Sequence, residues 1–195
     1  GTSIGNAISM LGKLKAALIS TGVGAIVVAL GAFVGLMKSA AEAGADFQKG
    51  LSTLRAVTGS TADELLILND QAKELGSTTQ FTAIEVVGLQ TELAKLGFTI
   101  KDIKNSTPAI LDLAASLEVD LASAAEFAGS VVRSFGLTTE DTQRVVDVMA
   151  KSTSTSALNF EALKESIKVV APAARATGVS IEKTAALLGI LANNG

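Results

Sequence analysis

The side chains of this sequence that could do chemistry are carboxylates, lysines, arginines and hydroxyls, because its 195 residues include no His and no Cys. A histidine base, a cysteine nucleophile and a zinc site of the usual kind are therefore excluded. The carboxylates that lie closest in sequence are the pairs Asp63-Glu64 and Glu140-Asp141, with Asp112 apart from both. Acid–base or metal chemistry would have to use these groups.

The elements that position these acids give them a simpler role. All but Asp112 fall in the first turn of a predicted helix, where free backbone N–H groups and the helix dipole favour negative charge. The predicted N-cap residues are Thr82, Thr99, Asp120, Thr138, Asn159 and Ser180. We therefore expect a protein that is not an enzyme and that has no metal or cofactor.

One joint design recurs between the predicted helices. A break, often made by Gly, is followed by an apolar residue and then by the cap, as in Gly97-Phe98-Thr99 and Gly178-Val179-Ser180. An apolar residue just before the cap suits a hydrophobic staple. Because the caps are unevenly spaced, the pattern predicts an irregular array of helices rather than a strict repeat.

The fold class predicted from this pattern is all-α. Apolar residues recur three and four positions apart throughout, and short joints favour antiparallel neighbours in an irregular bundle or a short solenoid. Pro108 is expected to open a fresh helix after a short one at residues 99–104, and Pro172 to kink or break its helix. The predicted domains are an N-terminal helical segment, residues 1–58, and a multi-helix domain, residues 59–195.

Residues 16–37 form an uncharged stretch between Lys15 and Lys38. As a helix it would be about 33 Å long, enough to cross the hydrocarbon core of a bilayer. Two interpretations stay open, a membrane-inserting helix and a helix buried between neighbours or copies. The candidates for membrane or self-association contacts are Ala16, Leu18, Ile19, Val23, Ile26, Val27, Val28, Leu30, Gly31, Phe33, Val34, Gly35, Leu36 and Met37.

The charge of the chain disfavours nucleic acid as a direct partner. The net charge is −3, and Lys13 and Lys15 are the only charged residues among the first 37, so the remainder is more acidic than the whole. Polyanion binders carry basic patches instead. A row of exposed cations is expected to be a solvated face; it comprises Lys73, Arg133, Arg144, Lys151, Lys164, Lys168 and Arg175.

Several sequence blocks, taken in order, resemble the core region of phage tail tape measure proteins. They span residues 54–61, 71–82, 92–99, 110–115, 134–137, 170–174 and 178–186, and include the runs QAKELGSTTQFT and GVSIEKTAA. Each block alone is only a capped helix, but their order and gaps are specific. The resemblance covers roughly residues 47–195.

The resemblance implies a structural virion protein that lies in the tail tube lumen, governs tail length and leaves ahead of the DNA. Implied partners are further copies, as in a trimer, the tail tube, the tail tip or baseplate, and the host membrane at infection. Implied locations are the host cytoplasm during assembly, the virion, and the host envelope during ejection. Because family members are much longer, we expect the chain to be an excerpt. The alternative is a membrane-active or pore-forming helical protein unrelated to tails.

Overall fold

The structure is a computed structural model that describes residue 13 and residues 42–194. The chain divides into two units, Gly1–Gly50 and Leu51–Gly195, and most of the described residues belong to the second. The predicted long hydrophobic helix at residues 16–37 lies outside the described residues, and the predicted domain division at residues 58 and 59 stays a prediction.

Helices account for nearly all of the second unit, and no strand occurs among the described residues, so the all-α prediction is confirmed. A helix over residues 42–58 is followed by α3 (Ala62–Thr78), α4 (Ala83–Lys95), α5 (Ile100–Leu117), α6 (Leu121–Phe135), the 3-10 helix η1 (Thr139–Asp141), α7 (Thr142–Thr155), α8 (Phe160–Ala176) and α9 (Ile181–Asn193).

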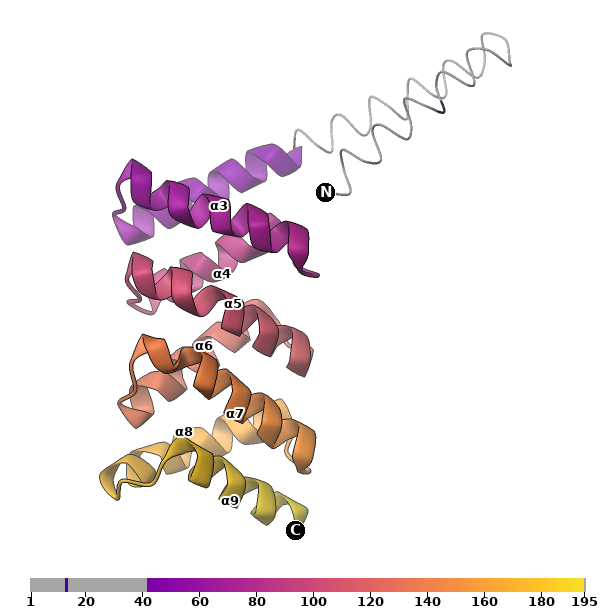
Figure 1. Cartoon of the computed structure of the whole chain (residues 1–195), viewed down its shortest axis with the longest axis vertical. Coiled ribbons are helices and arrows are strands. Elements are labelled where there is room, and N and C mark those ends of the chain that lie inside the picture. The colour runs from indigo at the N-terminus through magenta and orange to yellow at the C-terminus, as the bar shows by residue number, and fades with distance from the viewer. Residues whose placement is uncertain (1–12, 14–41, 195) are drawn as a thin grey trace. The chain divides into compact units, whose positions relative to one another are not determined.

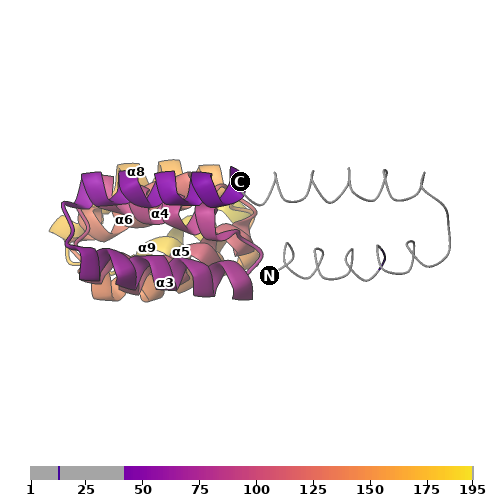
Figure 2. The ribbon, with the colours of Figure 1, turned by 90° about the horizontal axis from the view of Figure 1, so that it is seen from above.

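The helices stack in two layers (Figures 1 and 2). Helices α3, α5, α7 and α9 pack on one another in succession and form the first layer, while α4, α6 and α8 form the second. Each helix also packs on the next one in the chain. This arrangement is a short α-solenoid, one of the two architectures that the sequence left open.

The solenoid is more regular than the sequence suggested. The first-layer caps Thr61, Thr99, Thr138 and Ser180 are 38, 39 and 42 residues apart. The second-layer caps Thr82, Asp120 and Asn159 are 38 and 39 residues apart. The expected irregular array is therefore a repeat of two helices. The intervals between consecutive caps look uneven because joints that lead into the first layer alternate with joints that lead into the second layer.

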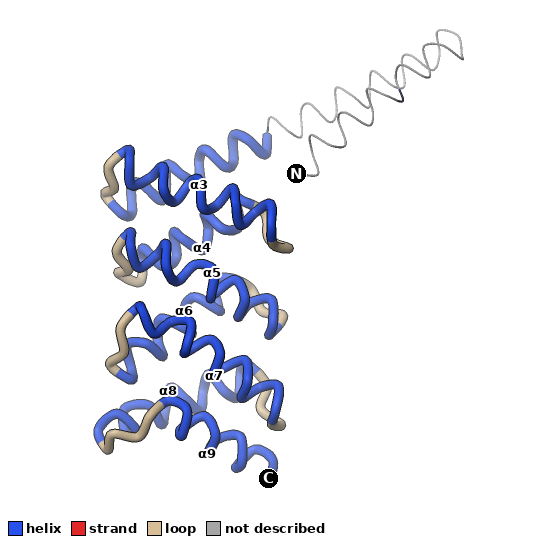
Figure 3. Tube along the Cα trace, viewed as in Figure 1, coloured by secondary structure: helices blue, strands red, loops and turns tan. Residues whose placement is uncertain are grey.

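The joints that lead into the first layer share one backbone geometry. Gly97, Gly136 and Gly178 have positive φ, which glycine adopts at little cost, and the amides of Phe98, Leu137 and Val179 each donate to a carbonyl five residues back. Figure 3 shows these short connections at the edges of the stack. The apolar residue of each joint thus closes one helix before the next residue opens another.

Pro108 does not open a new helix, contrary to the sequence prediction. Helix α5 runs through it from Ile100 to Leu117. Proline removes the hydrogen bond that the Lys104 carbonyl would otherwise accept, and the side-chain amide of Gln71 on α3 donates to that carbonyl instead, at 2.7 Å. Similarly, α8 continues past Pro172 without a break.

Gln71 also receives a hydrogen bond from the second layer. The buried Gln90 on α4 donates through Nε2 to Gln71 Oε1 at 3.2 Å and to the Leu68 carbonyl at 3.1 Å. Gln90, Gln71 and Lys104 therefore link α4, α3 and α5 through polar contacts. Gln90 Oε1 is buried and accepts no hydrogen bond from the described residues.

The hydrophobic core fills the space between the two layers and between successive helices of each layer. Its largest fully buried side chains include Leu68, Leu93, Ile110 and Met149, and Phe127 of α6 meets Phe160 of α8 edge to face at a centroid distance of 5.3 Å. Such a pair contributes about 0.5–1.5 kcal/mol beyond the area that it buries.

The end of α3 and the start of α4 approach closely at Gly76. A Cβ placed on Gly76 would lie 2.4 Å from the backbone nitrogen of Ala83 and 2.7 Å from its Cα. Both partners are backbone, so neither can rotate away. Gly88, on the exposed side of α4, has no atom within 4 Å of the same position.

We predict opposite effects for alanine at these two glycines. Gly76→Ala should lower the free energy of unfolding by about 1–3 kcal/mol, because the helices must separate to admit the methyl group. Gly88→Ala should raise it by up to about 1 kcal/mol, because alanine favours the helix. Urea denaturation followed by circular dichroism measures both, and equal effects of the two changes would contradict the close approach.

Candidate interaction surfaces

The predicted N-caps occupy helix starts in the structure. The side chains of Thr82, Thr99, Asp120, Asn159 and Ser180 each accept a hydrogen bond from a backbone N–H of the first turn. Thr138 precedes the one-turn helix η1, and its hydroxyl donates to Asp141 at 3.0 Å. Thr61, which also caps a helix, was missing from the predicted set although its joint resembles the others.

One acid of each pair that the sequence analysis considered for chemistry belongs to a helix cap. Glu64 accepts hydrogen bonds from the backbone and the hydroxyl of Thr61, and these bonds lower the pKa of its carboxyl. Asp141 is bonded in the same way to Thr138, again with a lowered pKa. Among the described residues, no three acidic side chains gather in a way that could hold a metal ion.

Successive first-layer helices are joined by polar contacts near their starts. Thr139 donates to Asp102, and Ser106 of α5 forms a buried hydrogen bond of 3.1 Å with Thr142 of α7. Burial raises the pKa of Asp102, but the hydrogen bonds from Thr139 and Thr99 outweigh it, so the pKa lies below its ordinary value. A capping carboxylate of one repeat therefore also binds the next repeat.

A short ionic contact joins α7 to α9. Arg144 Nε lies 2.6 Å from Glu182 Oε1, and Arg144 also reaches Asp141 at 3.3 Å. The hydrogen bond from Arg144, assisted by the helix-start amides and Ser180, lowers the pKa of Glu182 to about 2. Both partners of the pair are nearly half exposed, so solvent screens much of its energy.

Two arginines of the second layer lie over the end of the preceding helix in that layer. Arg133 of α6 donates to the carbonyl of Leu96, the C-cap of α4, at 3.1 Å. The guanidinium of Arg175 on α8 lies against Gly136, the C-cap of α6. Both arginines stand three residues before the next joint glycine, so this contact recurs with the repeat. A cation at this position is stabilised by the negative end of the helix dipole.

The predicted row of cations is not one surface. Lys73, Arg144 and Lys151 lie on first-layer helices, and the other four lie on α6 and α8. Several of them have specific neighbours, such as Glu165 beside Lys168 and the Phe160 ring beneath Lys164. The sequence could not separate these groups because both layers have the same helical periodicity.

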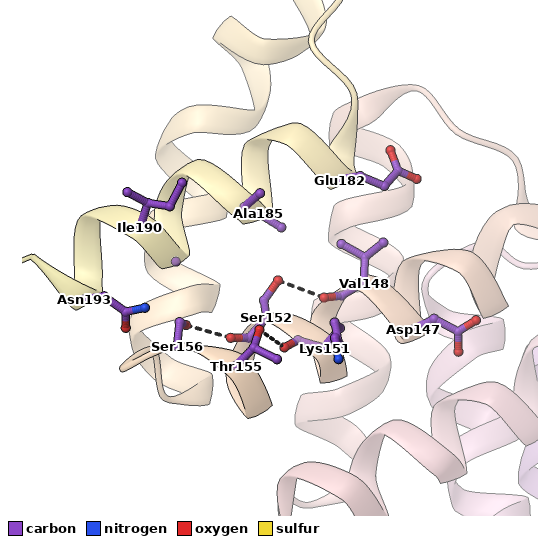
Figure 4. Close-up of a pocket in the computed structure, with 12 residues that line it drawn as sticks. Asp147, Val148, Lys151, Ser152, Thr155, Ser156, Glu182, Ala185, Ile190 and Asn193 are labelled. Carbon is purple, nitrogen blue, oxygen red and sulfur yellow. Dashed lines mark hydrogen bonds between the residues drawn. The ribbon is translucent and has the colours of Figure 1, made fainter.

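A groove of about 490 Å³ runs between α7 and α9 (Figure 4). The hydroxyls of Ser152, Thr155 and Ser156 face it but donate to carbonyls of their own helix at 2.6–2.8 Å. Asn193 accepts a hydrogen bond from the Ala157 amide at one end, and Glu182 binds Arg144 at the other. Its polar groups thus serve helix packing, and they do not converge on a ligand.

The candidates for membrane contact, residues 16–37, lie outside the described part of the chain. Across residues 42–194, none of the helices is both long enough and apolar enough to span a membrane.

We predict that the Arg144–Glu182 pair makes the stability of the fold decrease at low pH. Because the folded state lowers the pKa of Glu182 from 4.5 to about 2, the pair stabilises the fold above pH 4.5 and loses this effect as the pH falls towards 2. Urea midpoints measured from pH 7 to pH 2 should fall less steeply for Glu182→Gln than for the parent chain. Glu126→Gln, on the exposed side of α6, is the control. Parallel curves for Glu182→Gln and the parent would contradict the pair.

Comparison with known proteins identifies a family and two relatives. A family model described as phage-related minor tail protein matches residues 69–195. The chain is 34% identical over 183 residues to the tape measure protein of Pneumococcus phage Dp-1, covering 94% of this chain and 16% of that protein. It is 31% identical over 150 residues to the probable tape measure protein of Escherichia phage P2, covering 76% of this chain and 18% of that protein.

No solved structure matches the chain. The chain spans less than a fifth of the length of either relative. The matching family model, together with two tape measure relatives whose similarity extends along most of the chain, shows that the chain belongs to the phage-related minor tail proteins as a region of the tape measure family.

Proposed function

We propose that the chain is a non-enzymatic structural segment of a tape measure protein that lies in the tail tube lumen and helps to govern tail assembly. The similarity to two tape measure proteins over 94% and 76% of the chain carries this proposal. Its partners would be further copies of itself, as in a trimer, the tail tube, and the tip or baseplate. It would occupy the host cytoplasm during assembly and the virion tail afterwards.

The proposal includes release of the protein ahead of the DNA and entry of residues 16–37 into the host membrane. The length of that stretch and its lack of charge support membrane entry. The same segment can be kept from water by neighbouring copies before release. This combines the two interpretations of the stretch, because each applies at a different stage.

The geometry of the solenoid limits how this segment contributes to tail length. Neighbouring helices of one layer pack about 8–10 Å apart, so a repeat of two helices adds about 10 Å to the stack. The same 39 residues in one continuous helix would extend about 60 Å. We therefore propose that residues 51–195 form a packed module of the tape measure and that its ruler lies in other residues of the protein.

This proposal is tested in the phage that encodes the chain by duplicating one repeat, residues 99–137, so that Leu137 is followed by a second Thr99. Because the repeat is packed, tails measured by electron microscopy should lengthen by about 10 Å or less. Lengthening by about 60 Å would show that the segment is extended in the virion. Deleting residues 51–195 should prevent tail assembly, and infectious virions with normal tails would contradict the structural role.

A further inference from the structure

Helix α9 buries only one of the two faces that inner helices of its layer bury. Ile181 and Thr184, one and four residues after its cap, are buried against the preceding helices. Helices α5 and α7 bury both this face and the opposite one. The opposite face of α9 has no neighbour among the described residues.

Residues at the same distance from the N-cap in different first-layer helices show that the uncovered face of α9 corresponds to a buried face in the others. The residue seven positions after the cap is Leu68, Ser106 and Val145 in α3, α5 and α7, and each is fully buried. The residue eleven positions after the cap is Ala72, Ile110 and Met149, again fully buried. The corresponding residues of α9 are Leu187 and Leu191, whose exposed fractions are 58% and 67%.

The same face continues onto the second layer. Val170 of α8 is partly exposed, whereas its counterparts Leu93 and Val131, also eleven positions after their caps, are buried. In both layers, the position eleven residues after the cap is thus uncovered or only partly covered at this end of the solenoid. In each earlier repeat the next two helices cover these positions.

We propose that the face made by Leu187, Leu191 and Val170 seats one further helical hairpin of the same solenoid, belonging to the same polypeptide. The uncovered positions are those that the next two helices cover in earlier repeats. The hairpin should therefore stack on α8 and α9 in the same way as α8 and α9 stack on α6 and α7. Both relatives are more than five times as long as the region that matches this chain, so tape measure chains have ample sequence to supply it. Tube occupancy and membrane entry play no part in this inference.

The occupant also has a defined chemistry. The first-layer caps Thr99, Thr138 and Ser180 are each followed by Ile or Thr at one and four positions after the cap, as by Ile181 and Thr184 in α9. The seated hairpin should therefore begin its second helix with a Ser or Thr cap followed by small or apolar residues at these positions. A helix with charges at those positions would not fit.

The test compares the 195-residue chain with a chain lengthened by the 40 codons that follow it in its own gene. If a hairpin seats on this face, backbone amides of α9 should exchange with solvent at least tenfold more slowly in the longer chain, and its urea midpoint should rise. The double change Leu187→Glu and Leu191→Glu should abolish both gains. Val169→Glu, at a highly exposed position of α8 outside this register, should leave them unchanged.

Unchanged exchange of α9 in the longer chain, or a reading frame that stops within those codons, would overturn the proposal. Sedimentation of the 195-residue chain tests whether a second copy of the chain, instead of a hairpin, occupies this face. A dimer that Leu187→Glu and Leu191→Glu dissociate would identify a second copy as the occupant and would equally overturn the proposal. An oligomeric state that Leu187→Glu and Leu191→Glu leave unchanged, together with slowed exchange in the longer chain, is the expected result.

Discussion

The structure depends on one constraint, which is that each inner helix carries apolar side chains on two faces and can bury them only between the preceding and the following repeat. Leu68, Ile110 and Met149 reach complete burial because a further pair of helices packs on each. Burying a side chain of this size contributes about 1.5–3 kcal/mol, so the interfaces between repeats account for much of the folding free energy. Stability is therefore shared along the stack.

Polar contacts set the register in which the repeats stack. Caps such as Thr99 with Asp102 satisfy helix starts, and Asp102 also accepts a hydrogen bond from Thr139 of the next repeat. Arg133 and Arg175 reach back to the preceding helix of their layer. Each such contact is worth about 1 kcal/mol or less, but their recurrence every 38–42 residues favours one alignment of the apolar faces over others.

The sequence predicts local features well because their causes are local. The caps at Thr82 and Asp120 and the glycine turns depend on a few adjacent residues. The continuity of α5 could not be predicted, because the carbonyl that Pro108 frees is satisfied by Gln71, which lies 33 residues before Lys104 on another helix. The repeat could not be recognised from consecutive caps, because the cap spacing is regular only within each layer and the layer of each helix depends on tertiary packing. Membrane entry by residues 16–37 stays a prediction, because those residues are outside the described structure.

A stack held by neighbour contacts should open from its end, and native-state hydrogen exchange of the 195-residue chain tests this most directly. At low denaturant concentrations, amides of α9 should open with a lower free energy than amides of α5 and α6, since only one face of α9 is buried. Helix α7 should lie between them. If α9 opened with the same free energy as α5, the unit would fold as one indivisible core, and the account of a solenoid stabilised repeat by repeat would be contradicted.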